Sequence, residues 1–173
     1  MTSGRCPNHH DFNNVPRTLN KVRLLELLPH REPMLLLDEL VHVNASSGSA
    51  LVHVTNNSTF CIPDRGVPSW VGLEYMGQTA ALIGGFQQRS GVLDDHTGFL
   101  LGSRQFSTTL SSFTVGTSLR IHCEQSALVG ATLATFTARI HLNESINMPP
   151  IATAVLSVFR QPPAQDKNPG LTT

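Results

Sequence analysis

A long apolar run, WVGLEYMGQTAALIGG at residues 70–85, constrains the fold more than any other feature of the chain. Its Ala, Gly, Met, Leu and Gln residues favour a helix over a strand, and we predict a helix over residues 70–89. Ser69 lies just before it and is a candidate N-cap. The apolar residues surround most of the helical circumference, which is typical of a helix enclosed on nearly every side. The rest of the chain therefore has to wrap around this helix.

The remaining segments can supply the enclosing layer. A short helix is predicted at residues 19–28, ended by Pro29. Segments rich in β-forming residues lie at 34–43, 49–55, 98–110, 117–125, 131–142 and 151–160. This order predicts an α+β domain in which a curved, mainly antiparallel sheet wraps around a long central helix. We place the domain at residues 17–160, between a loose N-terminal arm (1–16) and a loose Pro-rich C-terminal tail (161–173).

Composition excludes several classes of function. The formal net charge is zero and only two lysines occur, so binding to nucleic acid or to an anionic membrane is not expected. Three widely spaced cysteines encode neither a disulfide framework nor a metal site, and we expect no cofactor. No apolar stretch reaches the roughly 18 residues of a membrane span, and no signal peptide is recognisable. A cytoplasmic location is the resulting expectation.

Two motifs resemble a known family. The segment LLPHREPMLLLDEL (27–40) and the segment PSWVGLEYMGQTAA (68–81) are similar, in the same order, to motifs of the hot-dog-fold 3-hydroxyacyl acyl-carrier-protein dehydratases. The resemblance covers about residues 19–160 and is nearest to a divergent branch of dehydratase-like proteins, some of which serve aryl polyene pathways. It implies a hot-dog fold and dehydration of a 3-hydroxyacyl thioester, carried on the phosphopantetheine of acyl carrier protein, to the trans-2-enoyl product. Fatty-acid-like or polyene biosynthesis would be the setting.

Glu74 is the one ionisable side chain of the apolar run. A buried carboxylate loses several kcal/mol of hydration unless something offsets the loss, which suggests a role for this residue. In the resembling family a helix carboxylate belongs to the catalytic pair, and Glu74 occupies its position. The alternative is a simple ion pair of Glu74 with Arg31 or Arg65, or a Glu74 that faces a water channel.

The histidine that relatives carry about fourteen residues before this carboxylate is missing, because residues 58–68 contain none. His30 is the candidate replacement, placed where the helix of a partner subunit could approach. Its alternative role is architectural, as a hydrogen-bond partner of the backbone. A histidine nitrogen within about 7 Å of the Glu74 carboxylate would favour the dehydratase, since a substrate could then bridge both groups.

Substrate-binding candidates flank Glu74. The backbone amides of Ser69 and Trp70, at the start of the helix, are candidate donors to the thioester oxygen. Trp70 and Gly77 share a predicted helix face with Glu74 and could floor an acyl tunnel, although Gly77 could equally permit close packing. Arg104 and Arg160 are alternative further candidates, for the phosphate of a pantetheine arm.

Two other functions on the same fold remain open: an acyl thioesterase, and a non-catalytic acyl-binding subunit of a hot-dog heteromer. Hot-dog relatives associate through sheet edges, and an exposed strand edge predicts a homodimer, a higher oligomer or a complex with a hot-dog partner subunit.

Overall fold

The computed structural model describes residues 17–93, 97–130 and 132–161, with the side chains from residue 21 onward. The helices are α1 (Arg17–Leu27) and α2 (Gly72–Arg89), and 3₁₀ turns occur at Ser69–Val71 and Asn143–Ser145. The strands are β1 (Glu39–Val43), β2 (Ser47–His53), β3 (Val67–Pro68), β4 (Thr97–Ser103), β5 (Ser107–Thr108), β6 (Ser112–Phe113), β7 (Ser118–Val129), β8 (Leu133–Leu142) and β9 (Ala152–Gln161). The arm predicted at 1–16 and residues 162–173 of the predicted tail lie outside the described residues.

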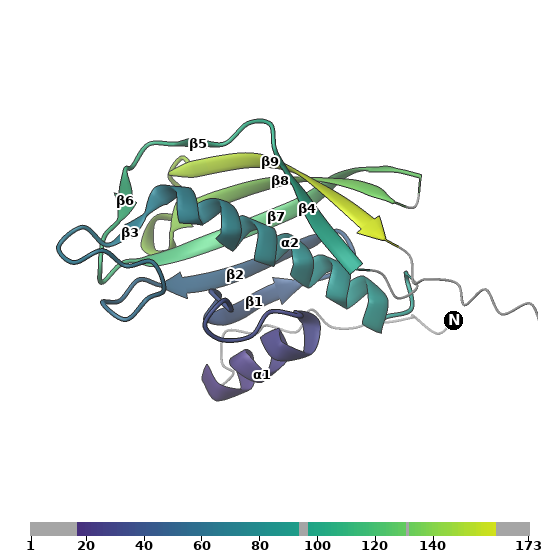
Figure 1. Ribbon diagram of the computed structural model, residues 1–173, viewed down its shortest axis with the longest axis horizontal. Helices are drawn as coiled ribbons and strands as arrows, with labels where there is room; N and C mark the ends of the chain where they lie inside the picture. The colour runs from purple at the N-terminus through teal and green to yellow at the C-terminus, as the bar shows by residue number, and fades with distance from the viewer. Residues whose placement is uncertain (1–16, 94–96, 131, 162–173) are drawn as a thin grey trace, which may run out of the picture.

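One seven-stranded antiparallel sheet dominates the fold, in the order β1-β2-β7-β8-β9-β4, with β5 pairing the other end of β9. Figure 1 shows α2 lying across one face of this curved sheet, while α1 lies beside the β1 end. Strands β3 and β6 form a separate small ladder next to the start of α2. The predicted α+β arrangement, a curved antiparallel sheet around a long central helix, is confirmed.

The core lies between α2 and the inner face of the sheet. Tyr75, Met76, Leu82 and Ile83 of α2 are at most 2% exposed. On β8, alternate residues are buried, and two of the four are alanines, which lets the helix approach the strand closely. A fully buried Leu, Ile or Met side chain contributes about 1.5–3 kcal/mol, so this layer explains why a nearly all-apolar helix is stable here.

Two predicted strands are shorter than expected. The strand predicted at 34–43 begins only at Glu39, because the backbone before it turns and bonds to α2. The strand predicted at 98–110 divides into β4 and β5, because ladder pairing with β9 stops after Ser103 and resumes at Ser107. Within β4, the register also shifts between Leu100 and Gly102, where Gly102 has φ +147°. A break in pairing of this kind leaves no separate mark in a run of β-forming residues.

The N-cap predicted at Ser69 is wrong. Ser69 opens a 3₁₀ turn, α2 itself starts at Gly72, and neither Pro68 nor Val71 makes a side-chain capping bond. The turn joins β3 directly to α2. The pairing of β3 with β6 therefore positions the start of the helix, and no capping hydroxyl is involved.

No helix within the described ranges is long and apolar enough to cross a lipid bilayer. The same residues contain no group of three or more His, Cys, Asp or Glu side chains arranged to hold a metal ion.

Candidate active site

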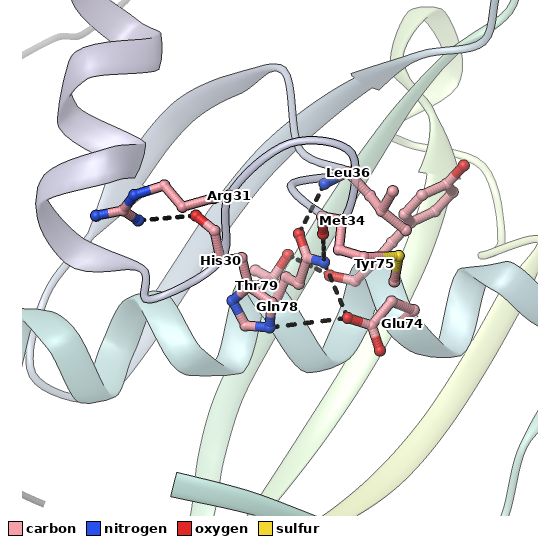
Figure 2. Close-up of polar contacts among 8 residues, drawn as sticks. All are labelled: His30, Arg31, Met34, Leu36, Glu74, Tyr75, Gln78 and Thr79. Atoms are coloured by element: carbon pink, nitrogen blue, oxygen red, sulfur yellow. Dashed lines mark hydrogen bonds and ion pairs between the residues drawn. The ribbon is translucent and has the colours of Figure 1, made fainter. Parts of the chain in front are cut away.

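Glu74 and His30 lie next to each other in one chain. Glu74 is in the first turn of α2, and His30 is in the loop that follows α1. The His30 Nε2 atom lies 3.9 Å from Glu74 Oε1, well inside the allowance of about 7 Å for a bridging substrate (Figure 2). The expected burial of Glu74 is only partial, since its side chain is 36% exposed and that of His30 is 30% exposed. Both groups are therefore open to a ligand.

Gln78 holds this arrangement in place. Its Nε2 donates to Glu74 Oε1 at 2.9 Å and to the Met34 carbonyl at 2.7 Å, while its Oε1 accepts the Leu36 N–H at 3.0 Å (Figure 2). Gln78 is 1% exposed, so these bonds lie in a dry region. One buried amide thus ties the loop that carries His30 to the helix that carries Glu74.

The ion-pair alternative for Glu74 and the architectural alternative for His30 conflict with the contacts. Arg31 donates to the carbonyls of Leu28 and His30 and not to Glu74. Within the described part of the chain, Glu74 makes polar contacts with His30 and Gln78. The buried His30 Nδ1 has no hydrogen-bond partner, so the ring is not held by the backbone as the architectural role requires.

A groove of about 440 Å³ extends from this pair along α2. The helix face that lines it carries small side chains, Gly77, Ala81 and Gly84, while Leu100 of β4 and Phe136 of β8 form part of the opposite wall. A Cβ built at Gly77 would lie 3.5 Å from Leu100 Cδ2, which is ordinary van der Waals contact. At Gly84 a Cβ would meet no atom within 4 Å, so the space beside the helix is open there.

A larger hollow of about 660 Å³ lies on the far side of the 32–39 segment, against α1 and β2. Its lining includes neither His30 nor Glu74. We place the site in the smaller groove, because only that groove combines apolar walls with the acid–base pair.

Ser69 and Trp70 do not lie where the sequence placed them. The Ser69 N–H donates to the Ser111 carbonyl at 3.0 Å, so this amide is already engaged. The Trp70 side chain is 62% exposed, contacts Phe60 with ring centroids 5.9 Å apart, and does not line the groove. A 3₁₀ turn advances about 120° per residue and an α-helix about 100°, which displaces Trp70 from the face predicted for a continuous helix.

Arg160 also differs from its predicted role. It is 4% exposed and lines the groove from the inner face of the sheet, so it faces the interior of the groove and not the outer surface of the protein. The sequence analysis did not predict that Gln78 would position Glu74. An amide side chain four residues after a carboxylate, in an otherwise apolar helix, could have indicated this hydrogen bond.

Comparison with known proteins identifies the family. The family model of the ApeP-like proteins, described as ApeP dehydratase, matches residues 22–168. The chain belongs to the ApeP-like dehydratase family. The resemblance predicted from the two motifs is thereby confirmed.

Relatives of this ApeP-like chain include a curated dehydratase and solved hot-dog structures. The 3-hydroxyacyl acyl-carrier-protein dehydratase FabZ of Gluconobacter oxydans is 33% identical over 78 residues, which cover 42% of this chain and 46% of that protein. The chain thus spans about half the length of the curated relatives that it matches.

The dehydratase heterocomplex ApeI:P of Xenorhabdus doucetiae superposes with a TM-score of 0.70 and 26% identity, covering 80% of this chain and 90% of that chain. A hypothetical thioesterase protein of Streptococcus pneumoniae, solved with coenzyme A, has a TM-score of 0.55 and 15% identity, covering 72% of this chain and 87% of that chain, which shows the fold alone. The hot-dog fold predicted from the sequence is confirmed.

Proposed function

We propose that this ApeP-like protein dehydrates a 3-hydroxyacyl thioester carried on acyl carrier protein, giving the trans-2-enoyl product. The observation that carries the proposal is the His30–Glu74 pair, 3.9 Å apart at one end of an apolar groove. Dehydration needs one group to accept a proton from C2 and another to donate a proton to the departing hydroxyl at C3. The pair supplies both within reach of one substrate.

In this mechanism His30 takes the C2 proton and Glu74 delivers a proton to the C3 hydroxyl, which leaves as water while the C2–C3 double bond forms. Transfer of the proton from His30 back to Glu74 restores both groups. The separation of 3.9 Å is longer than a hydrogen bond, and such contacts often tighten only when substrate is bound. Gln78 keeps the Glu74 carboxylate aimed toward His30.

The thioester oxygen needs a donor as negative charge develops on it. The Ser69 amide is engaged with the Ser111 carbonyl and Trp70 does not line the groove, so neither of the two predicted amides is assigned this role. The acyl chain would follow α2 past Gly77, where the lack of a side chain widens the groove. The proposed reaction uses no metal or redox cofactor.

Association with a second hot-dog chain is part of the proposal. Strand β4 ends the sheet order and exposes Phe99 (47%) and Leu101 (63%). An apolar edge strand with unpaired backbone groups favours addition of another strand. The likeness to the ApeI:P heterocomplex supports either a second copy or a related partner subunit.

The test is incubation of the purified protein with 3-hydroxyacyl and acyl carrier-protein substrates, followed by mass spectrometry of the carrier. We expect loss of water from the 3-hydroxyacyl form. Glu74→Gln and His30→Gln should each lower kcat by about 10²–10⁴-fold, the contribution of a positioned acid or base. Glu124→Gln, an exposed carboxylate of β7, is the matched control and should leave kcat unchanged. Unchanged turnover in both site variants would rule out the assignment.

A second candidate function is a subunit that acts only within a heteromer, which the ApeI:P likeness favours. No change of substrate with the chain alone, and loss of water once a partner hot-dog subunit is added, would select it. Release of the acyl group in place of water would instead select the thioesterase.

A further inference from the structure

A buried guanidinium lies at the opposite end of the groove from the His30–Glu74 pair. Arg160 is on β9, its side chain belongs to the inner face of the sheet, and the residue is 4% exposed. Its Nη2 donates to the Gln125 Oε1 at 3.0 Å. Its Nη1 is buried and has no hydrogen-bond partner.

No carboxylate among the described residues forms an ion pair with Arg160. Its one side-chain acceptor, Gln125 Oε1, is neutral and is shared with Gln87 Nε2 at 3.1 Å. Burying a charge is costly unless it is paired and fully hydrogen-bonded, and burial lowers the pKa of Arg160 for the same reason. The Nη1 group of Arg160 can therefore still donate a hydrogen bond to one anionic acceptor.

Arg160 lines the same groove as Glu74. Through Gln125 it is linked to Gln87 of α2, which is thirteen residues beyond Glu74. At about 1.5 Å per residue, this places the guanidinium about 20 Å along the helix from the acid–base pair.

The groove between the two ends is apolar and open. Phe136 and Val158 form part of its wall, and a Cβ built at Gly84 would meet no atom within 4 Å. An extended acyl chain entering past His30 can therefore reach toward Arg160 without meeting another charged group of α2.

We infer that this groove selects acyl chains whose far end carries a carboxylate, which Arg160 binds through its free Nη1. The inference rests on the proposed function, because that function places the thioester at the Glu74 end. A guanidinium suits a carboxylate in particular, because charge-assisted hydrogen bonds to it are short and strong. A purely hydrocarbon tail would leave the buried donor without a partner.

The test uses binding and needs no turnover, so that it is separate from the test of dehydration. A length series of acyl pantetheine amides, each made with a terminal methyl or a terminal carboxylate, is titrated into the full chain by calorimetry. We expect the carboxylate form to bind about tenfold more tightly once the chain is long enough to reach Arg160, and no such advantage for short chains. Equal or weaker binding of the carboxylate form at every length would overturn the inference.

Arg160→Met removes the donor while keeping an apolar side chain, and it should abolish the preference for the carboxylate. Arg139→Met is the matched control, an exposed arginine on the neighbouring strand β8, and should retain the preference. Should Arg160→Met fail to fold, the comparison of the two ligands on the unaltered protein still decides the question. If the pure chain binds carboxylate tails selectively but dehydrates nothing, the inference about the groove holds while the proposed reaction fails.

Discussion

Two consecutive glycines of α2 provide a sharp test of how the helices are packed. A Cβ built on Gly85 would lie 2.0 Å from the Leu27 carbonyl oxygen and 2.8 Å from its carbon. A Cβ built on the adjacent Gly84 would meet no atom within 4 Å. Gly84→Ala and Gly85→Ala therefore make the same chemical change in the same helix, and only one of them meets a neighbour.

The expected effects have opposite signs. Alanine is favoured over glycine inside a helix by about 1 kcal/mol, so Gly84→Ala should stabilise the protein by up to that amount. At Gly85 the same gain is offset by an overlap with backbone, which cannot rotate away as a side chain can. Relieving it requires the end of α1 to move, at a cost of about 1–3 kcal/mol or more. Because the helix gain is common to both variants, they should differ in free energy of unfolding by the cost of the overlap, about 1–3 kcal/mol.

Thermal unfolding measures this difference directly. At about 2–4 °C per kcal/mol for a chain of this size, the melting temperatures should differ by about 2–12 °C, with Gly85→Ala the lower. Because Leu27 lies three residues before His30, Gly85→Ala should also reduce dehydration of the 3-hydroxyacyl substrate, whereas Gly84→Ala should leave short-chain substrates unaffected. Equal melting temperatures for the two variants would refute the close α1–α2 contact.

Two further predictions concern polar groups. Gln78→Met should lower the free energy of unfolding by about 2–4 kcal/mol, because the Leu36 N–H and the Met34 carbonyl lose their partner, and an unchanged urea midpoint would contradict this. Burial lowers the pKa of His122, so the unfolded chain holds this proton more tightly, and stability should fall as the pH drops below about 6.5. His122→Gln should flatten that loss in urea titrations between about pH 7.5 and pH 5, and identical slopes for variant and wild type would show that His122 does not contribute.

Local sequence patterns predicted the helices and strands correctly where residues close in the sequence determine the structure. The helix over residues 70–89 was predictable because its composition favours a helix and its apolar residues leave no polar face. The later strands were predictable from their β-forming residues, although the interruption between Ser103 and Ser107 was not, since register depends on the partner strand. The Ser69 cap and the Trp70 face were wrong because a 3₁₀ turn, set by pairing of β3 with β6, precedes the helix.

The sequence by itself determined that a nearly all-apolar helix must be enclosed by strands, and that Glu74 and His30 were the candidate catalytic residues. Only the tertiary structure decided that these two lie 3.9 Å apart in one chain, and that Arg160 is buried at the other end of their groove. The physical reason is that the apolar pattern of a helix or strand depends on residues close together in the sequence. The distance between two side chains forty-four positions apart depends instead on how helix, loop and sheet pack together.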